Sequence, residues 1–199
     1  MSGANLDVEL NSEICVIRFA RPKERNPLSI SILEELDRIT DSIDSNVKSL
    51  IFTGSEDVFA SGANLREIAA LKTEAEIREF GLRGQRLMQK IALMHCQTIA
   101  AVNGFCFGGA LDLALACRIR IASPDSMFSH PGANLGIITG WGGTQRLPRI
   151  VGEAAALEMF LTAKRITAHE AWKMNLISQI SESVLDSARQ IAFSHSAND

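Results

Sequence analysis

The chain has 199 residues, of which 46% are apolar and 22% charged, and its formal net charge is −3. This length and composition are typical of one globular domain with a sizeable core, so we expect a single domain over residues 1–199. The acidic balance, the absence of Lys/Arg runs and the lack of tyrosine argue against a nucleic-acid-binding surface, which leaves small molecules as the expected partners.

Cysteine use and the start of the chain indicate a reducing compartment. The four cysteines form no CxxC pair and lie in apolar surroundings, as buried free thiols do; they are Cys15, Cys96, Cys106 and Cys117. The first ten residues, MSGANLDVEL, lack the basic and apolar regions of a secretory signal. We therefore expect a cytoplasmic protein, although an organellar protein without its transit peptide would have the same features.

The first part of the chain predicts two strands and a helix. Apolar and polar residues alternate over residues 6–10 and 14–19, with a tight turn at Asn11-Ser12 between them. A charged loop bounded by prolines covers residues 21–27. Ser29 then provides a cap for a helix that runs to about residue 45, because apolar side chains recur on one face.

Strands and helices alternate in the middle of the chain. Residues 48–53 predict a strand. Residues 58–71, VFASGANLREIAAL, predict a short strand that breaks at Ser61-Gly62 and becomes a helix near Asn64. Apolar residues at helical spacing over 74–94 predict a long helix.

The stretch 98–117, TIAAVNGFCFGGALDLALAC, organises the chain around one lone carboxylate, Asp112. A run of this length with a single charge is long enough to span a bilayer. We reject a membrane helix because Asn103-Gly104 is a turn dipeptide, Gly108-Gly109 is a poor helix interior, and Asp112 would be costly in lipid. The better interpretation is a buried strand, a glycine-rich turn over residues 103–109 and an apolar helix.

Short strands, a glycine-rich loop and helices follow. Residues 118–122 and 127–129 predict strands, and the loop that begins at His130 closes into a helix around Thr144. The last predicted elements are helices over 153–162, 168–174 and 182–193 and a strand over 177–180. This order predicts an α/β fold of repeated ββα-like units over residues 1–150, followed by a helical part over residues 151–199.

Two strand-glycine-helix junctions, at Gly62 and at Gly108-Gly109, form the candidate reaction site. Each places a backbone N–H at the start of a helix, and Ala63 and Gly109 are the natural donors. Two such groups that converge on one oxygen form an oxyanion hole, in which each donor lowers the barrier by about 2.7–4 kcal/mol. This suits a thioester carbonyl that becomes an enolate, and Asp112, one helical turn beyond Gly109, would move a proton beside it.

Structural explanations exist for the same residues. Gly62 is then a turn residue, Gly108-Gly109 permits close helix packing, and Asp112 is an acidic residue favoured in a first helical turn. His130 ends a strand and opens the glycine-rich loop, but a lone histidine is more often structural. Cys106, between two phenylalanines and without an assigned base, is expected to be buried and inert.

The sequence contains none of the following motifs of nucleotide-binding proteins, serine hydrolases or zinc proteases. No G-x-G-x-x-G follows a strand, and the chain contains no G-x-x-x-x-G-K-[ST], G-x-S-x-G or H-E-x-x-H sequence. No paired-cysteine spacing typical of zinc is present, so no metal site is expected.

Four segments resemble motifs of the crotonase superfamily, the enoyl-CoA hydratase/isomerase group. They are PKERNPLS, VFASGANLREI, IAAVNGFCFGGALDLALAC and GWGGTQRLPRIVG, in the family order and at comparable spacing. The resemblance runs from about residue 6 to the last residue. It implies a crotonase-like (ClpP/crotonase) spiral of ββα units, a coenzyme A thioester substrate with no tightly bound cofactor, and a homo-oligomer that is a trimer or a dimer of trimers.

The resemblance also assigns roles to individual residues. Ala63 and Gly109 match the oxyanion-hole positions, and Asp112 matches the first of two catalytic glutamates. The positions that match the substrate and coenzyme A site are Lys23, Glu24, Ala63, Asn64, Leu65, Arg66, Gly108, Gly109, Gly132 and Gly140.

Several positions depart from the family pattern. Asp112 is one methylene shorter than glutamate, and the second glutamate position is Gly132, which has no side chain. Asn64 stands where an aspartate is usual, and Arg118 where an acidic residue is frequent. If the loop around Gly132 has the family's backbone geometry, a Gly132→Glu substitution is expected to increase hydration.

The end of the chain gives an expectation about assembly. Relatives continue past the position of Asp199 through helices that form trimer contacts, so the helical part is expected to be truncated. The predicted helix over residues 182–193 has an apolar face, and we expect that face to lie at or near a self-association interface.

Two classes of function follow from these residues. The first is an acyl-CoA-processing enzyme of fatty acid metabolism, a lyase or isomerase, that stabilises a thioester enolate and moves a proton or double bond on an enoyl-CoA with a single carboxylate. The second is an acyl-CoA-binding relative with little or no catalysis, which the lack of a second carboxylate favours. Exchange of the α-proton with deuterated water would distinguish the two.

Overall fold

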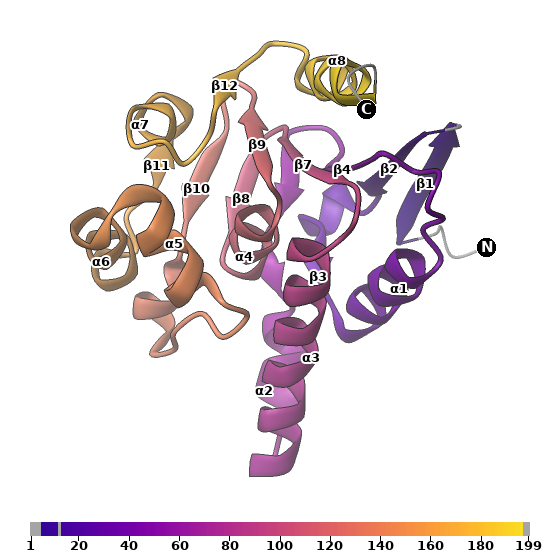
Figure 1. Cartoon of the computed structure of the whole chain (residues 1–199). Helices are drawn as coiled ribbons and strands as arrows, with labels where there is room; N and C mark the ends of the chain where they lie inside the picture. Colours follow the sequence, from indigo (N-terminus) through magenta and orange to yellow (C-terminus); the bar gives the residue numbers. More distant parts are fainter. Residues whose placement is uncertain (1–4, 12, 197–199) are drawn as a thin grey trace.

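The computed structural model describes residues 5–11 and 13–196, and its largest layer is a six-stranded sheet. Its strands are Leu6–Asn11 (β1), Ile14–Phe19 (β2), Ser49–Thr53 (β4), Gln97–Val102 (β7), Ile119–Ala122 (β9) and Gln179–Ile180 (β12). They lie side by side in this order (Figure 1). The β1–β2 pair is antiparallel, as the predicted tight turn requires, and every later pair in this sheet is parallel.

The chain also forms two smaller sheets. One has four strands in the spatial order Ile166–Thr167 (β11), Met127–Ser129 (β10), Phe105–Phe107 (β8) and Val58–Ala60 (β5). The other pairs Pro27–Leu28 (β3) with Gly62–Ala63 (β6) in parallel. No pattern in the sequence predicted β3, β6, β8 or β11, because two or three residues are too few to carry an alternating pattern.

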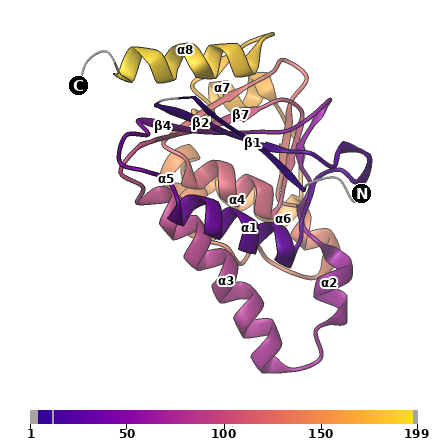
Figure 2. The same ribbon diagram turned by 90° about the vertical axis from the view of Figure 1, so that its right-hand side faces the viewer.

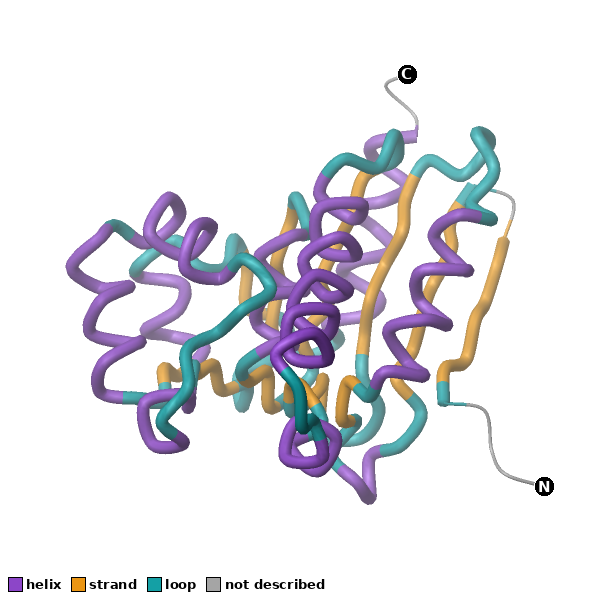
Figure 3. Tube along the Cα trace, turned by 90° about the horizontal axis from the view of Figure 1, so that it is seen from below, coloured by secondary structure: helices purple, strands orange, loops and turns teal. Residues whose placement is uncertain are grey.

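Helices cover both faces of the six-stranded sheet. The α-helices are Ile30–Asp41 (α1), Leu65–Ala70 (α2), Glu74–Ala92 (α3), Gly109–Ala116 (α4), Gly143–Val151 (α5), Glu153–Thr162 (α6), Ala168–Lys173 (α7) and Val184–Ser196 (α8). Helices α1, α3 and α4 lie on one face and α8 on the other (Figure 2). Seen from below, the first group lies in front of the strands (Figure 3). Two short 3-10 helices, Pro22–Glu24 (η1) and Pro131–Leu135 (η2), lie in the connections.

Burial on both faces explains the apolar sequences of the central strands. All five residues of β4 are buried, and β2 and β7 each have only one residue that is partly exposed. On one face, Leu36 of α1 and Leu87 of α3 belong to the core cluster that contains Phe52. The predicted cap of α1 is present, since the amide of Ile32 donates to the Ser29 hydroxyl at 3.3 Å.

Helix α1 ends at Asp41, earlier than the predicted residue 45. The carboxylate of Asp44 accepts a hydrogen bond from the amide of Asn46 at 2.8 Å. This local turn competes with helical hydrogen bonding and stops the helix.

The apolar face of α8 is buried inside the molecule. Val184, Ala188 and Ala192 are buried in a cluster that includes Ile99 and Ile121 of the six-stranded sheet. The expectation that this face is itself free to form an interface is therefore wrong, because the sheet covers it, while self-association of the chain stays a prediction. The segment predicted as a helical part, residues 151–199, also contributes β11 and β12 to two of the sheets.

Within residues 5–11 and 13–196, none of the helices combines the length and the apolar character that a bilayer span requires.

Ala188→Asp tests the packing of α8 on the sheet. A carboxylate at this fully buried position has no partner, so we expect the free energy of unfolding to fall by roughly 3 kcal/mol. The control is Gln190→Asp on the exposed side of the same helix, which should change it by less than about 0.5 kcal/mol. Urea unfolding followed by circular dichroism measures both, and equal effects would contradict this packing.

Candidate active site

The two glycine junctions predicted from the sequence lie against each other. A Cβ atom at Gly62 would come within 2.5 Å of the carbonyl oxygen of Phe107 and 2.9 Å of the amide nitrogen of Gly109, so only glycine fits there. Gly62 also has a φ of +89°, which glycine adopts without strain. This contact brings β6, which carries Ala63, beside the first residue of α4.

Ala63 and Gly109 line one cavity of about 280 Å³. Gly109 is the first residue of α4, so its N–H has no acceptor within the helix. Gly108 precedes it with φ +55° and ψ −122°, and the amide of Gly108 donates to the carbonyl of Ser129 at 2.9 Å. That hydrogen bond ties the turn to the end of β10. The backbone of both junctions therefore faces a space that a ligand can enter.

The remaining wall of this cavity is mostly apolar. It comes from α2, from α3 and from the loop that follows β10. Its apolar side chains are Leu65, Ile68, Ile77, Phe80, Leu135, Ile137 and Ile138. Leu65, Ile77 and Ile138 are largely exposed, so an apolar ligand would cover surface that now faces water.

Asp112 is fully buried at the base of this cavity wall. Its Oδ2 accepts hydrogen bonds from the Thr139 hydroxyl and, at 3.2 Å, from the Trp141 amide. Burial raises the pKa of Asp112 to about 6, while the contacts with Thr139, Trp141 and Gly143 and the charge of Arg146 act in the opposite direction. Asp112 is therefore mostly ionised at neutral pH and still close to the pKa that suits a general base.

His130 lies beside Asp112 in the same cavity. Its ring is 3% exposed, and its Nε2 is 3.7 Å from Asp112 Oδ1. Burial lowers the pKa of His130 to about 4, so the imidazole is neutral at pH 7. The sequence marked His130 only as a lone histidine at a strand end, whereas the fold places its ring beside the Asp112 carboxylate.

Gly132 lines the cavity but has no room for a side chain. A Cβ atom there would come within 2.4 Å of the carbonyl oxygen of Ile137, and the amide of Ile137 donates to the Gly132 carbonyl at 3.0 Å. The backbone geometry on which the Gly132→Glu expectation depends is therefore not present here, because the new side chain would displace the loop rather than extend into the cavity.

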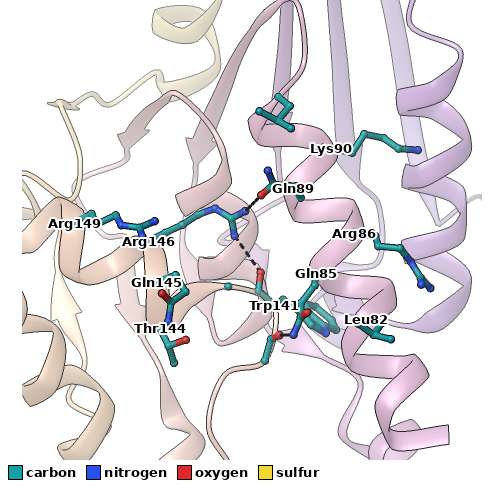
Figure 4. A pocket seen from close by; sticks show the side chains of 13 residues that line it. Leu82, Gln85, Arg86, Gln89, Lys90, Trp141, Thr144, Gln145, Arg146 and Arg149 are labelled. Carbon is teal, nitrogen blue, oxygen red and sulfur yellow. Dashed lines mark hydrogen bonds between the residues drawn. The ribbon is translucent and has the colours of Figure 1, made fainter. Parts of the chain in front are cut away.

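Gly140 and Trp141 separate the cavity from a second, larger groove of about 880 Å³ between α3 and α5 (Figure 4). The indole of Trp141 fills the space beside two glycines. A Cβ atom would lie 2.2 Å from it at Gly84 and 2.3 Å from it at Gly109. Trp141 thus locks the loop against both α3 and the start of α4.

Arg146 and Gln85 hold this loop from the groove side. Arg146 Nη1 donates to the Trp141 carbonyl at 3.2 Å, and Gln85 Nε2 donates to the Gly140 carbonyl at 2.8 Å (Figure 4). The same loop carries the two donors to Asp112. The segment GWGGTQRLPRIVG resembles a family motif, but its residue types predict no role for Trp141 or Arg146, since the glycines are its only local signal.

Other predicted site residues lie away from the cavity wall. Lys23, Glu24 and Arg66 are exposed on η1 and α2. Asn64 caps α2, because its side-chain oxygen accepts from the amide of Arg66 at 3.1 Å. Of the predicted substrate positions, the structure brings together at the cavity Ala63, Leu65, Gly108, Gly109, Gly132 and Gly140.

Metal and thiol chemistry find no support in the part of the chain that the structure describes. No group of three or more His, Cys, Asp or Glu side chains there is placed to hold a metal ion. The four cysteines are buried and free. Burial raises the pKa of the Cys106 thiol well above its ordinary value, so the reactive thiolate is disfavoured.

Known proteins match this chain in both sequence and structure. The family model for enoyl-CoA hydratase/isomerase matches residues 9–196. The short-chain-enoyl-CoA hydratase of Clostridium acetobutylicum is 38% identical over 193 residues, which are 94% of this chain and 74% of that protein. The crotonyl-CoA hydratase of Syntrophomonas wolfei is 38% identical over 197 residues, 96% of this chain and 75% of that protein. The chain thus spans about three quarters of the length of these relatives.

Solved structures confirm the predicted crotonase-like α/β fold. The enoyl-CoA hydratase of Bacillus anthracis superimposes with a TM-score of 0.92 at 33% identity, over 97% of this chain and 77% of that one. DspI of Pseudomonas aeruginosa superimposes with a TM-score of 0.93 at 30% identity, over 98% of this chain and 81% of that one.

Asp112 and His130 make opposite contributions to the pH dependence of stability. The pKa of Asp112 rises from its ordinary 3.8 to about 6 on folding, so the folded state loses stability as pH increases through this window. The pKa of His130 falls from its ordinary 6.5 to about 4, so the folded state loses stability as pH decreases through that window. In the parent chain the two effects on the free energy of unfolding nearly cancel between about pH 4 and pH 6. The reason is that unfolding moves one proton from Asp112 to His130, so the total number of bound protons hardly changes.

Substitution of either residue alone should reveal how the other one makes the free energy of unfolding depend on pH. Relative to the parent, we expect His130→Gln to lose about 2 kcal/mol of unfolding free energy as pH rises from 4 to 6, because only the Asp112 effect remains. Asp112→Asn should gain a similar amount of unfolding free energy over the same pH range, because only the His130 effect remains. Urea unfolding of both variants and the parent at pH 4, 5, 6 and 7 measures this. If the unfolding free energy of both variants changed with pH in the same direction, the burial assigned to Asp112 and to His130 would be contradicted.

Proposed function

We propose that this chain, which belongs to the enoyl-CoA hydratase/isomerase family, forms and quenches the enolate of an acyl-CoA thioester. The observation that carries the proposal is the convergence of two glycine junctions and one buried carboxylate on a single, mostly apolar cavity. The relatives are hydratases by name, and the reaction proposed for this chain is the transfer of a proton or the shift of a double bond on an enoyl-CoA.

The thioester oxygen binds between the amides of Ala63 and Gly109. Negative charge on this oxygen grows as the enolate forms, so fixed N–H donors stabilise the transition state more than the ground state. The apolar wall formed by side chains such as Leu65, Ile77 and Ile138 covers the acyl chain. Exclusion of water by that chain strengthens the two hydrogen bonds.

Asp112 transfers the proton. Its carboxylate removes a proton from Cα, and the electron pair of the C–H bond moves to the thioester oxygen. When the proton on Asp112 is first replaced by one from solvent, its delivery to Cα gives exchange, and delivery of the proton to Cγ of a 3-enoyl thioester moves the double bond. A pKa near 6 supports this role, because the carboxylate is ionised at neutral pH and its conjugate acid returns the proton readily.

The coenzyme A part lies over the outer end of the cavity. The amide of Ser61, a residue of the cavity wall, donates to the carbonyl of Arg25 at 3.0 Å, and this ties the η1 loop to β6. Lys23 and Glu24 on that loop and Arg66 on α2 are exposed there and contact the nucleotide.

A second candidate function is binding of acyl-CoA without turnover. It is favoured by Gly132, which has neither a carboxylate nor room for one. The two candidates share every binding contact and differ only in proton transfer, so exchange of the α-proton decides between them.

Asp112→Asn tests the proton transfer. With butyryl-CoA in deuterated water, we expect the parent to exchange its α-protons and the variant to exchange them at least about 100-fold more slowly, because general-base catalysis is lost. The parent rate should rise with pH through about 6 and then level off, as the pKa of Asp112 requires. Mass spectrometry of the recovered thioester measures exchange. A parent that binds butyryl-CoA without any exchange would support the non-catalytic candidate.

Gly109→Pro tests the oxyanion donor, with Gly109→Ala as its matched control. Both variants add a Cβ that meets Trp141 at 2.3 Å, but only proline removes the N–H. We expect Gly109→Pro to exchange the α-protons of butyryl-CoA about 100-fold more slowly than Gly109→Ala, which corresponds to the loss of one donor. Equal rates in the two variants would rule out a role for this amide.

A further inference from the structure

The groove of about 880 Å³ between α3 and α5 has four cationic side chains in its wall, and no acidic side chain is among the described residues that line it. The cations are Arg86 and Lys90 of α3 and Arg146 and Arg149 of α5. The chain as a whole has a net charge of −3, so the groove is a local excess of positive charge. Its volume is in the range of sites that bind small molecules.

The two cations of α3 already have acidic partners. Arg86 Nη2 lies 2.5 Å from Glu79 Oε1, and Lys90 contacts the carboxylates of Asp37 and, at 2.8 Å, of Asp41. None of these carboxylates lines the groove. The side chains of Arg86 and Lys90 point away from α5 (Figure 4). Their charges are therefore compensated outside the groove.

The two arginines of α5 have no acidic partner within hydrogen-bond distance in the part of the chain that the structure describes. A guanidinium has five N–H donors. Arg146 uses two of them, from Nη1 to the Trp141 carbonyl at 3.2 Å and from Nη2 to Gln89 Oε1 at 3.4 Å (Figure 4). The guanidinium of Arg149 is exposed and makes no hydrogen bond or ion pair with another described residue. Both groups keep free donors at the groove.

Arg146 and Arg149 also repel each other. They are three positions apart on α5, so their side chains share one face of this helix. Burial lowers the pKa of Arg146, the charge of Asp112 opposes this effect, and the charge of Arg149 adds to it. Two uncompensated like charges in one groove wall cost stability, and an anion bound between them would remove that cost.

We infer that this groove binds a small molecule that carries a diphosphate group, with the guanidinium of Arg146 on one phosphate and that of Arg149 on the other. The planar fork of a guanidinium matches the oxygens of a phosphate, and a diphosphate offers a separate set of oxygens to each arginine. Thr144 and Gln145 line the same groove and add neutral donors.

The proposed site is separate from the region that the proposed function assigns to coenzyme A. Gly140 and Trp141 lie between the groove and the cavity that Ala63 lines, whereas Lys23 and Arg66 are on η1 and α2. A ligand in the groove would still contact the loop that holds Asp112, because Arg146 donates to the Trp141 carbonyl.

Titration calorimetry with inorganic pyrophosphate, at neutral pH and without divalent cations, tests the site. We expect the parent to bind one pyrophosphate and Arg149→Gln to raise its Kd at least about tenfold, because charge-assisted hydrogen bonds are lost. Arg149→Lys keeps the charge without the fork and should raise the Kd less than Arg149→Gln does. The matched control is Arg78→Gln, which removes the same charge from an exposed position of α3 outside the groove and should change the Kd less than about twofold. An equal loss in Arg78→Gln and Arg149→Gln would show that only net charge matters and would overturn the inference.

Gln145→Glu tests the lack of carboxylates in the groove. The new carboxylate would neutralise the arginines and repel phosphate, so we expect the Kd for pyrophosphate to rise at least about tenfold. Gln190→Glu makes the same change at an exposed position of α8 and should leave the Kd within about twofold of the parental value. Unchanged binding in Gln145→Glu would overturn the inference. Both substituted side chains are exposed, and urea unfolding checks that each variant is folded.

The remaining outcomes concern the place of the anion. Absence of pyrophosphate binding by the parent overturns the inference. So does a Kd that Lys23→Gln raises and Arg149→Gln leaves unchanged, because the anion would then lie on the η1 loop. Displacement of pyrophosphate by saturating coenzyme A would contradict a separate site, and equal affinity for orthophosphate would contradict binding by two arginines. None of these measurements uses turnover, so each result leaves the proposed function to its own tests.

Discussion

The close contact between β6 and the start of α4 is the constraint on which the site depends. Neither segment has space for a side chain where they meet, because Gly62 faces the Gly109 amide and Gly109 faces the indole of Trp141. The contact is fixed from two sides, by the pairing of β6 with β3 and by the hydrogen bond from Gly108 to Ser129 of β10. Backbone donors held in this way need no reorganisation when charge develops on a ligand.

Burial of Asp112 beneath this contact places a reactive group where the core would otherwise be apolar. Loss of hydration raises the pKa of the carboxyl, and the loop that contains Thr139 and Trp141 offsets part of that cost through two hydrogen bonds. Gln85 and Arg146 hold the loop from the opposite side. The reactivity of Asp112 thus depends on α3 and α5 as well as on its own helix.

Much of the fold was predictable from local patterns. Alternating apolar residues predicted the β1–β2 pair, and the hydroxyl of Ser29 marked the start of α1. Short strands such as β8 were not predicted. The pairing of β8 with β5 and β10 involves too few residues to produce a periodic signal in the sequence. The face of α8 was recognised as apolar, but its partner was misassigned, because periodicity shows which face is buried and not what covers it.

The sequence by itself determined the two glycine junctions, the lone carboxylate of Asp112 and the family, since each depends on neighbouring residues or on ordered motifs. Only the tertiary structure decided that His130 lies 3.7 Å from Asp112, that Thr139 and Trp141 hold that carboxylate, and that the Gly132 backbone excludes a side chain. These relations join residues from separate elements. Their distances are set by how strands, helices and loops pack together, and no local pattern of residue types encodes that packing.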